Sequence, residues 1–181
     1  MAEINGTQRA RGMAVFVGID PDVDRSGVAR LDMVGGAPAS LSLSSIPFGA
    51  LLFFLSKLRD EMAAGGTPCV VVVEAGWANK GNWHVRWSDN NKLACAKGYN
   101  VGRNHEAGRK IAELVKALGF HVDEVRPLRK IWKGKDGKIS AAEFGALTGF
   151  RQRSTQDARD AGLLAWNAAG LPLRISVSGG G

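Results

Sequence analysis

The sequence contains little cysteine, which excludes one way of stabilising a small protein. Its 181 residues include two cysteines, Cys69 and Cys95, too few for the disulfide framework of a small secreted domain. Cys69 begins an apolar run of the kind that forms a buried strand. We therefore expect a reduced protein of the cytoplasm, or of the host cytoplasm or nucleoid if the gene is viral or part of a mobile element.

Long apolar runs are also missing. The apolar segment 46–55 has ten residues, whereas a bilayer-spanning helix needs about 20. The first twelve residues are polar and lack the apolar core of a signal peptide. We expect no membrane partner, a disordered basic arm over 1–12, a single domain over 13–175 and a flexible tail over 176–181.

Positive charge, by contrast, is in excess. There are 24 Lys and Arg against 17 Asp and Glu, which gives a net charge of +7 and a pI near 9.8. A polyanionic partner such as nucleic acid would explain this charge, and solubility alone is the other explanation. The contents of hydrophobic residues, 45%, and of charged residues, 23%, are ordinary for a soluble globular domain.

The apolar patterns predict an α/β protein. The predicted strands are 14–20, 28–33, 40–46, 69–74 and 120–125. The predicted helices are 47–64, 105–119, 139–147 and 155–169, the last capped by Ser154 or Thr155. A stretch without periodicity, 75–103, separates the fourth strand from the second helix. This order predicts a five-stranded mixed sheet, an antiparallel meander followed by parallel strands, flanked by helices.

Four carboxylates stand where this fold would bring them together. Asp20 and Glu74 end two predicted strands, and Asp157 and Asp160 lie three residues apart on one face of the last helix. Converging carboxylates repel one another unless a cation neutralises them, and Mg²⁺ prefers oxygen ligands. In a basic protein this pattern indicates metal-dependent cleavage of phosphodiesters. The alternatives are strand-end acids that face solvent, and first-turn acids that only favour the helix dipole.

Three segments resemble the motifs of RuvC-type Holliday-junction resolvases. They are Gly18-Ile19-Asp20-Pro21 with Ser26-Gly27-Val28-Ala29, Val71-Val72-Val73-Glu74, and Asp157-Ala158-Arg159-Asp160-Ala161. The resemblance implies an RNase H-like nuclease domain with two Mg²⁺ or Mn²⁺ ions per active site. It implies that the ions are held by Asp20, Glu74, Asp157 and Asp160, with Asp20 between them.

The resemblance has further implications and one departure. Trp77, three residues after Glu74, falls where the family carries an aromatic residue that helps open the junction centre. The family also has lysines near the scissile phosphate, for which Lys133 and Lys138 are the candidates, and we assign Lys138 a catalytic role. Asp22 stands where the family usually has glycine, which adds negative charge near the site.

Basic residues flank the predicted carboxylate site. Contacts to nucleic acid are expected from Trp77, Lys80, Arg86, Arg103, Arg129, Lys130, Lys133, Lys135 and Lys138. Phosphate contacts of this kind would position a substrate without reading its sequence, and a solvated charged surface is the alternative. Trp77, Trp83 and Trp87 would stack on unpaired bases at a branch point, or else form a loop cluster or a dimer contact.

These features together predict an endodeoxyribonuclease that resolves four-way DNA junctions by paired symmetric nicks, through two-metal hydrolysis. Because a four-way junction has two-fold symmetry, we expect a C2 homodimer, with helix 105–119 in its interface. The alternatives are a nuclease for other branched DNA or structured RNA, and a non-catalytic junction-binding module. The preferred cleavage sequence and the ion used in the cell stay open.

Overall fold

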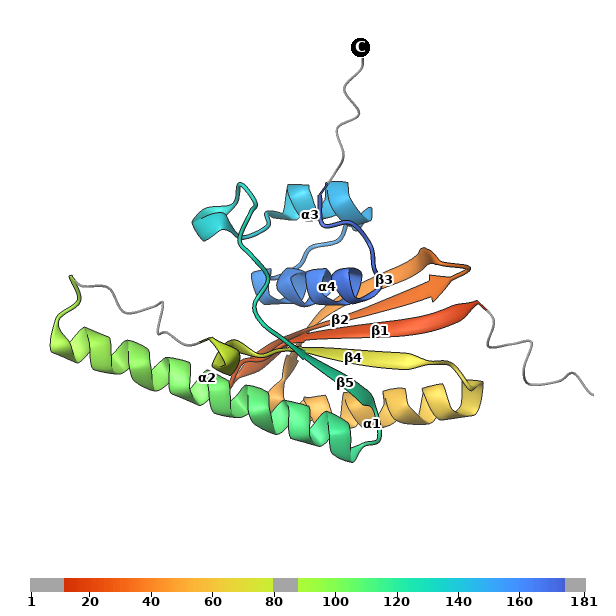
Figure 1. The fold of residues 1–181 in the computed structure, drawn as a ribbon, viewed down its shortest axis with the longest axis horizontal. Coiled ribbons are helices and arrows are strands. Elements are labelled where there is room, and N and C mark those ends of the chain that lie inside the picture. Colours follow the sequence, from red (N-terminus) through yellow and green to blue (C-terminus); the bar gives the residue numbers. More distant parts are fainter. Residues whose placement is uncertain (1–11, 80–87, 175–181) are drawn as a thin grey trace, which may run out of the picture.

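The computed structural model describes residues 12–79 and 88–174 (Figure 1). Its strands are β1 (Met13–Asp20), β2 (Arg25–Val34), β3 (Ala37–Pro47), β4 (Cys69–Glu74) and β5 (His121–Val125). Its helices are α1 (Phe48–Gly65), α2 (Asn91–Ala117), α3 (Ala141–Thr148) and α4 (Gln156–Ala168), with the short 3-10 turns η1 (Gly76–Ala78) and η2 (Lys135–Gly137). Apart from Gly12, the predicted arm and tail lie outside the described residues.

The strands form one sheet in the order β3-β2-β1-β4-β5. The β1–β2 and β2–β3 pairs are antiparallel, and the β1–β4 and β4–β5 pairs are parallel. The predicted five-stranded mixed sheet, a meander followed by parallel strands, is therefore confirmed. Helices α1 and α2 cover one face of the sheet, and α3 and α4 cover the other (Figure 1).

Each face of the sheet has its own core. Alternate residues of β1 and β4, such as Val17 and Val71, pack with Leu55 of α1 and Ile111 of α2. On the opposite face, Leu31 of β2 packs with α4 residues of the segment 161–166. Because side chains alternate along a strand, Asp20 and Glu74 lie on the α4 face, opposite to their neighbours Ile19 and Val73.

The hairpin between β2 and β3 is tighter than predicted. Gly35 and Gly36, with φ values of 60° and 82°, make the turn by themselves, and Ala37 and Pro38 already pair with β2. Pro38 is tolerated because β3 is an edge strand. The strands β2 and β3 are accordingly longer than the predicted 28–33 and 40–46.

The helix α2 begins much earlier than the predicted residue 105. Asn90 caps it, with a side chain that accepts a hydrogen bond from the Leu93 amide at 2.9 Å. All buried residues of α2 lie between Gly108 and Val115, and its first half projects past the sheet (Figure 1). A helical segment that faces no core needs no apolar period, which explains why the pattern missed it.

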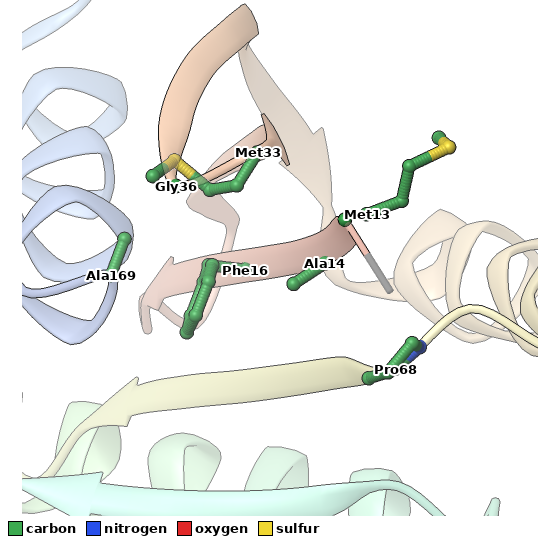
Figure 2. A pocket seen from close by; sticks show the side chains of 8 residues that line it. Met13, Ala14, Phe16, Met33, Gly36, Pro68 and Ala169 are labelled. Atoms are coloured by element: carbon green, nitrogen blue, oxygen red, sulfur yellow. The ribbon is translucent and has the colours of Figure 1, made fainter. Parts of the chain in front are cut away.

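An open hollow of about 400 Å³ lies at the end of β1 that is farthest from Asp20 (Figure 2). It is lined by Gly12, Met13, Ala14, Phe16, Met33, Gly36, Pro68 and Ala169. None of these residues is ionisable, so the hollow offers no group for acid–base or metal chemistry. Among the described residues, no helix has both the length and the apolar character that a membrane crossing requires.

Candidate active site

Asp20 and Glu74 end neighbouring strands at the same edge of the sheet. β1 and β4 run parallel with Ile19 beside Val73, so the next residue of each strand is an acid on the α4 face. The strand residues that precede the two acids are apolar and largely buried. Asp20 and Glu74 are therefore the first ionisable side chains at these strand ends. The ends of β1 and β4 that carry Asp20 and Glu74 are therefore neighbours in the sheet.

Two glycines allow the start of α4 to lie directly on the sheet. A Cβ atom on Gly18 would stand 2.0 Å from the Ala161 carbonyl oxygen, and one on Gly27 would stand 2.1 Å from the Asp157 carbonyl oxygen. A side chain at either position would push the helix away. These glycines belong to the motif around Asp20, and their contribution is the close approach of the helix that carries Asp157 and Asp160.

Three of the predicted carboxylates form a cluster. Oxygens of Asp20, Asp157 and Asp160 all lie within 4.8 Å of one another. Thr155, rather than Ser154, caps α4, because its hydroxyl accepts a hydrogen bond from the Ala158 amide at 3.3 Å. This cap fixes the first helical turn, from which Asp157 and Asp160 extend toward Asp20. Glu74 is not part of this triplet but lies close enough to interact with it, as the pKa shifts show.

Burial and mutual repulsion raise the pKa values of three of the four carboxylates. Burial, followed by the charges of Glu74, Asp160 and Asp157, raises the pKa of Asp20 well above its ordinary value. Burial and the Asp160 charge likewise raise the pKa of Glu74 to about 7. Burial also raises the pKa of Asp157. Hard oxygen donors that repel one another are the donor set that fits a divalent cation such as Mg²⁺ or Mn²⁺.

Of the two candidate lysines, Lys138 reaches the carboxylates. Its Nζ donates a hydrogen bond to Asp160 Oδ2 at 3.1 Å. Partial burial acts to lower the pKa of Lys138, but the carboxylates of Asp160, Asp20 and Asp157 together outweigh burial and raise it. The side chain of Lys133 is exposed, and its backbone amide donates to Glu143 at 2.9 Å.

Lys130, like Lys138, lies close enough to Glu74 for its charge to act on that carboxylate. Its positive charge is one of the two that lower the pKa of Glu74, against the larger effect of burial. Two lysines of one loop, Lys130 and Lys138, therefore stand near the carboxylates. Lys135 and Arg129, also predicted to contact nucleic acid, are exposed on this loop.

Asp22, the departure from the family pattern, has a structural role. Its Oδ1 accepts hydrogen bonds from the backbone amides of Asp24, at 2.9 Å, and Arg25, at 3.3 Å. Its Oδ2 accepts a hydrogen bond from Asn104 Nδ2 of α2 at 3.2 Å. The side chain thus closes the turn between β1 and β2 and joins this turn to α2.

Trp77 packs against the protein in η1. A Cβ atom on Gly108 would stand 2.4 Å from Cζ3 of the indole, so α2 lies directly on the ring. The guanidinium of Arg109 lies 6.0 Å from the ring centre. The indole is half-buried and belongs to the core under α1 and α2. This geometry favours a packing role, and base stacking by Trp77 stays a prediction.

The other predicted nucleic-acid contacts are spread more widely. Arg103 is exposed on α2, with its guanidinium 5.7 Å from the centre of the Tyr99 ring. Lys80, Arg86, Trp83 and Trp87 lie outside the described residues. The structure therefore brings Lys130 and Lys138 to the carboxylates and leaves Arg103 on the surface of α2.

Sequence reasoning missed two residues at the site. Gln156 donates from Nε2 to Asp160 Oδ1 at 2.8 Å, and Arg159 donates from Nη2 to Gln156 Oε1 at 2.8 Å. The spacing of Gln156 and Asp160, four residues apart on a helix, was a signal that could have found this contact. Nothing in the sequence pattern indicated that Arg159 turns toward Gln156 rather than toward solvent.

The chain is similar in fold to solved structures of RuvC from Thermus thermophilus. One is T. thermophilus RuvC in complex with a Holliday junction substrate, with 15% sequence identity; the match covers 84% of this chain and 90% of that chain with a TM-score of 0.49. A second T. thermophilus RuvC structure has 17% identity, with coverage of 86% and 96% and a TM-score of 0.45. The chain resembles RuvC in fold. At these identities the likeness concerns the fold alone.

No family model matches the sequence, and no curated protein matches it at a significant level.

Proposed function

We propose that this protein is a metal-dependent endonuclease that resolves four-way DNA junctions by paired symmetric nicks. The observation that carries the proposal is the meeting of Asp20, Asp157 and Asp160, from the first strand and the last helix, within 4.8 Å. Three carboxylates gathered on a basic protein are costly without a cation, and Lys138 beside them offers a positive charge to a phosphate.

Asp20, Asp157 and Asp160 would hold the divalent ions, and Glu74 would complete the coordination from β4. Two bound Mg²⁺ or Mn²⁺ ions would supply an activated water and neutralise the charge that develops on the phosphate. Asp20 lies close enough to Glu74, Asp157 and Asp160 for their charges to raise its pKa, which suits an acid shared by two ions. Lys138, held near Asp160 by a hydrogen bond, would orient the scissile phosphate.

The basic loop that carries Lys130 and Lys138 would hold the DNA backbone on the α4 side of the sheet. Such phosphate contacts give affinity without sequence preference, which suits a nuclease that recognises branched structure. The Holliday junction substrate in one of the similar RuvC structures supports the same substrate class for this chain.

Paired nicks require two active sites, so we propose a C2 homodimer. The apolar side of the predicted interface helix, which includes Gly108 and Val115 of α2, is already buried against the sheet. A dimer contact along 105–117 would therefore use the charged side of α2, where Glu106, Arg109, Lys110 and Glu113 are exposed.

The sequence analysis gave two alternatives to a junction-resolving endonuclease. A nuclease for other branched DNA or structured RNA would use the same cluster. A non-catalytic junction-binding module would not need it, and the preserved carboxylates argue for a catalyst.

Cleavage of a synthetic mobile four-way junction tests the proposal, with matched linear duplex and RNA/DNA hybrid as comparison substrates and with or without Mg²⁺ or Mn²⁺. We expect paired symmetric nicks in the junction alone, and only with metal. Cutting of the hybrid or of flaps would agree with the proposed metal site but would contradict the four-way junction as the substrate. Tight junction binding without cutting under either metal would contradict the proposed catalysis.

A further inference from the structure

Both carboxylate oxygens of Asp160 have protein donors. Oδ2 accepts from Lys138 Nζ at 3.1 Å, and Oδ1 accepts from Gln156 Nε2 at 2.8 Å. A carboxylate oxygen has two lone-pair directions, so each oxygen can still offer one to a cation. The two donors therefore fix the plane of the Asp160 carboxylate and leave it able to bind metal.

The amide of Gln156 can make this hydrogen bond in only one of its two orientations. Arg159 Nη2 lies 2.8 Å from Gln156 Oε1. Because a guanidinium has donors and no acceptor, it requires the amide oxygen to face it, and the amide nitrogen then faces Asp160. Without Arg159, the amide could turn its oxygen toward the carboxylate. Arg159 thus determines which group Gln156 presents to Asp160.

Arg159 also ties together the two segments that meet at Asp160. Its Nη1 donates to the Ser154 carbonyl at 2.8 Å and to the Ser154 hydroxyl at 3.3 Å. Its Nε donates to the carbonyl of Ile139 at 3.3 Å. Ile139 directly follows Lys138, so one side chain joins the lysine-bearing loop to the turn that precedes α4. The fixed fork of an arginine can make all these contacts at once.

We propose that Arg159 is a positioning residue that acts through Gln156 on Asp160 and through Ile139 on Lys138, and that it thereby sets the affinity of the carboxylate cluster for divalent metal. This inference rests on the function proposed above, since it concerns the same cluster. Arg159 contacts neither metal nor substrate in this scheme.

Direct metal binding tests the proposal without any need for cleavage. Mn²⁺ would be titrated calorimetrically into the wild-type protein, Gln156→Leu and Arg159→Met, with Gln152→Leu and Arg59→Met as matched controls. Gln152 is exposed in the loop before α4, and Arg59 is exposed on α1 with Asp60 as its partner. We expect Gln156→Leu and Arg159→Met to raise the Mn²⁺ Kd by roughly 10–100-fold, as is typical when a group that orients a metal ligand is lost. The controls should bind like wild type.

A second readout separates positioning from stability. Without metal, Gln156→Leu should lower the Tm less than Arg159→Met does, because it removes two hydrogen bonds rather than four. In junction cleavage, Gln156→Leu should need about 10-fold more Mn²⁺ for half-maximal rate and recover at saturating Mn²⁺. Arg159→Met should recover less, because the loop of Lys138 also loses its anchor.

The outcomes distinguish this inference from the proposed function. If both variants bind Mn²⁺ like wild type and only Tm changes, Arg159 is merely structural and the inference is wrong. If wild type binds Mn²⁺ and the variants do not, but nothing cuts a junction, the inference holds and the function is wrong. If wild type binds no Mn²⁺, both are wrong.

Discussion

Neighbouring residues of β1 lie in two different surroundings. Ile19 is fully buried among the aliphatic side chains under α1 and α2. Asp20 lies on the other face, where the backbone of α4 approaches the glycines Gly18 and Gly27 and where acids gather. The first face is held by interdigitating side chains, which can adjust. The second is held by helix backbone directly on strand backbone, which cannot adjust, and this rigidity is what an ordered set of metal ligands needs.

The largest expected effect is on the α4 face. Asp20→Asn should reduce metal-dependent junction cleavage by at least about a hundredfold, because it removes the acid shared by the cluster. Junction binding should be largely retained, since basic residues carry the affinity. Without metal, its Tm should rise by roughly 2–4 °C because a buried repulsion is relieved. Cleavage and melting assays check both, with exposed Asp24→Asn as the control, and normal cleavage by Asp20→Asn would contradict the site assignment.

Gly18→Ala probes the close contact of α4 with the sheet. Its Cβ would stand 2.0 Å from the Ala161 carbonyl oxygen and 2.9 Å from the Ala165 nitrogen, so α4 must move. We expect a loss of roughly 3 kcal/mol in the free energy of unfolding, measured by urea denaturation, together with weaker Mn²⁺ binding. Gly102→Ala is the control, because a Cβ there meets nothing within 4 Å and should stabilise α2 by about 0.5–1 kcal/mol. Equal behaviour of the two variants would refute the backbone-contact explanation.

The acids on the α4 face should also make stability depend on pH. Because the folded-state pKa of Glu74, about 7, lies above its ordinary value of 4.5, the folded state holds a proton that the unfolded state releases between these pH values. The metal-free protein should therefore lose stability, on the order of 1–3 kcal/mol, as pH rises from about 4.5 to about 7.

Metal should reverse this dependence, since Mg²⁺ binds the deprotonated acids. Melting curves against pH, with EDTA or with Mg²⁺, check the expectation. In Glu74→Gln the decline in EDTA should be shallower than in wild type. A wild-type protein in EDTA that is equally stable at both pH values would argue against the buried repulsion.

The smallest effect is expected for a substitution of Ile19, the residue next to Asp20 in β1. Ile19→Val removes one methyl group from the core under α1 and α2 and should cost about 0.5–1.5 kcal/mol. Cleavage and the Mn²⁺ Kd should stay at wild-type values, because Ile19 lies on the opposite face from the carboxylates. A tenfold change in either would show that the two faces are coupled more closely than the packing indicates.

Much of this organisation could be predicted from the sequence, because burial leaves a strong pattern. The apolar runs that end in Asp20 and Glu74 fixed the sheet edge at which the acids meet, and the fold class followed from the order of elements. The sequence assigned Lys138 a catalytic role, but the hydrogen bond from Lys138, and not Lys133, to Asp160 is visible only in the structure. It depends on the path of a loop that includes Asp136 at a φ of 56°, which no periodicity describes.

Other features of the structure left no pattern in the amino-acid sequence that could have predicted them. The first half of α2 faces no core, so its helix left no apolar period. Asp22 was interpreted as extra charge near the site, and its charge does help to raise the pKa of Asp157. Its hydrogen bonds to backbone amides and to Asn104 left no pattern in the sequence. Arg159 was given no role from the sequence, because its hydrogen bonds depend on which acceptors lie within reach in three dimensions.

Within the described residues, Asp20 ends the first strand, β1, whereas Asp157 and Asp160 lie on the last helix, α4. During synthesis, most of the sheet can form while α4 is still inside the ribosome. If the proposed function is right, a partly synthesised chain could bind DNA through its basic surfaces without being able to cut it. On this proposal the ability to cut would arrive only with α4, so a chain that stalls before α4 would bind DNA without cutting it.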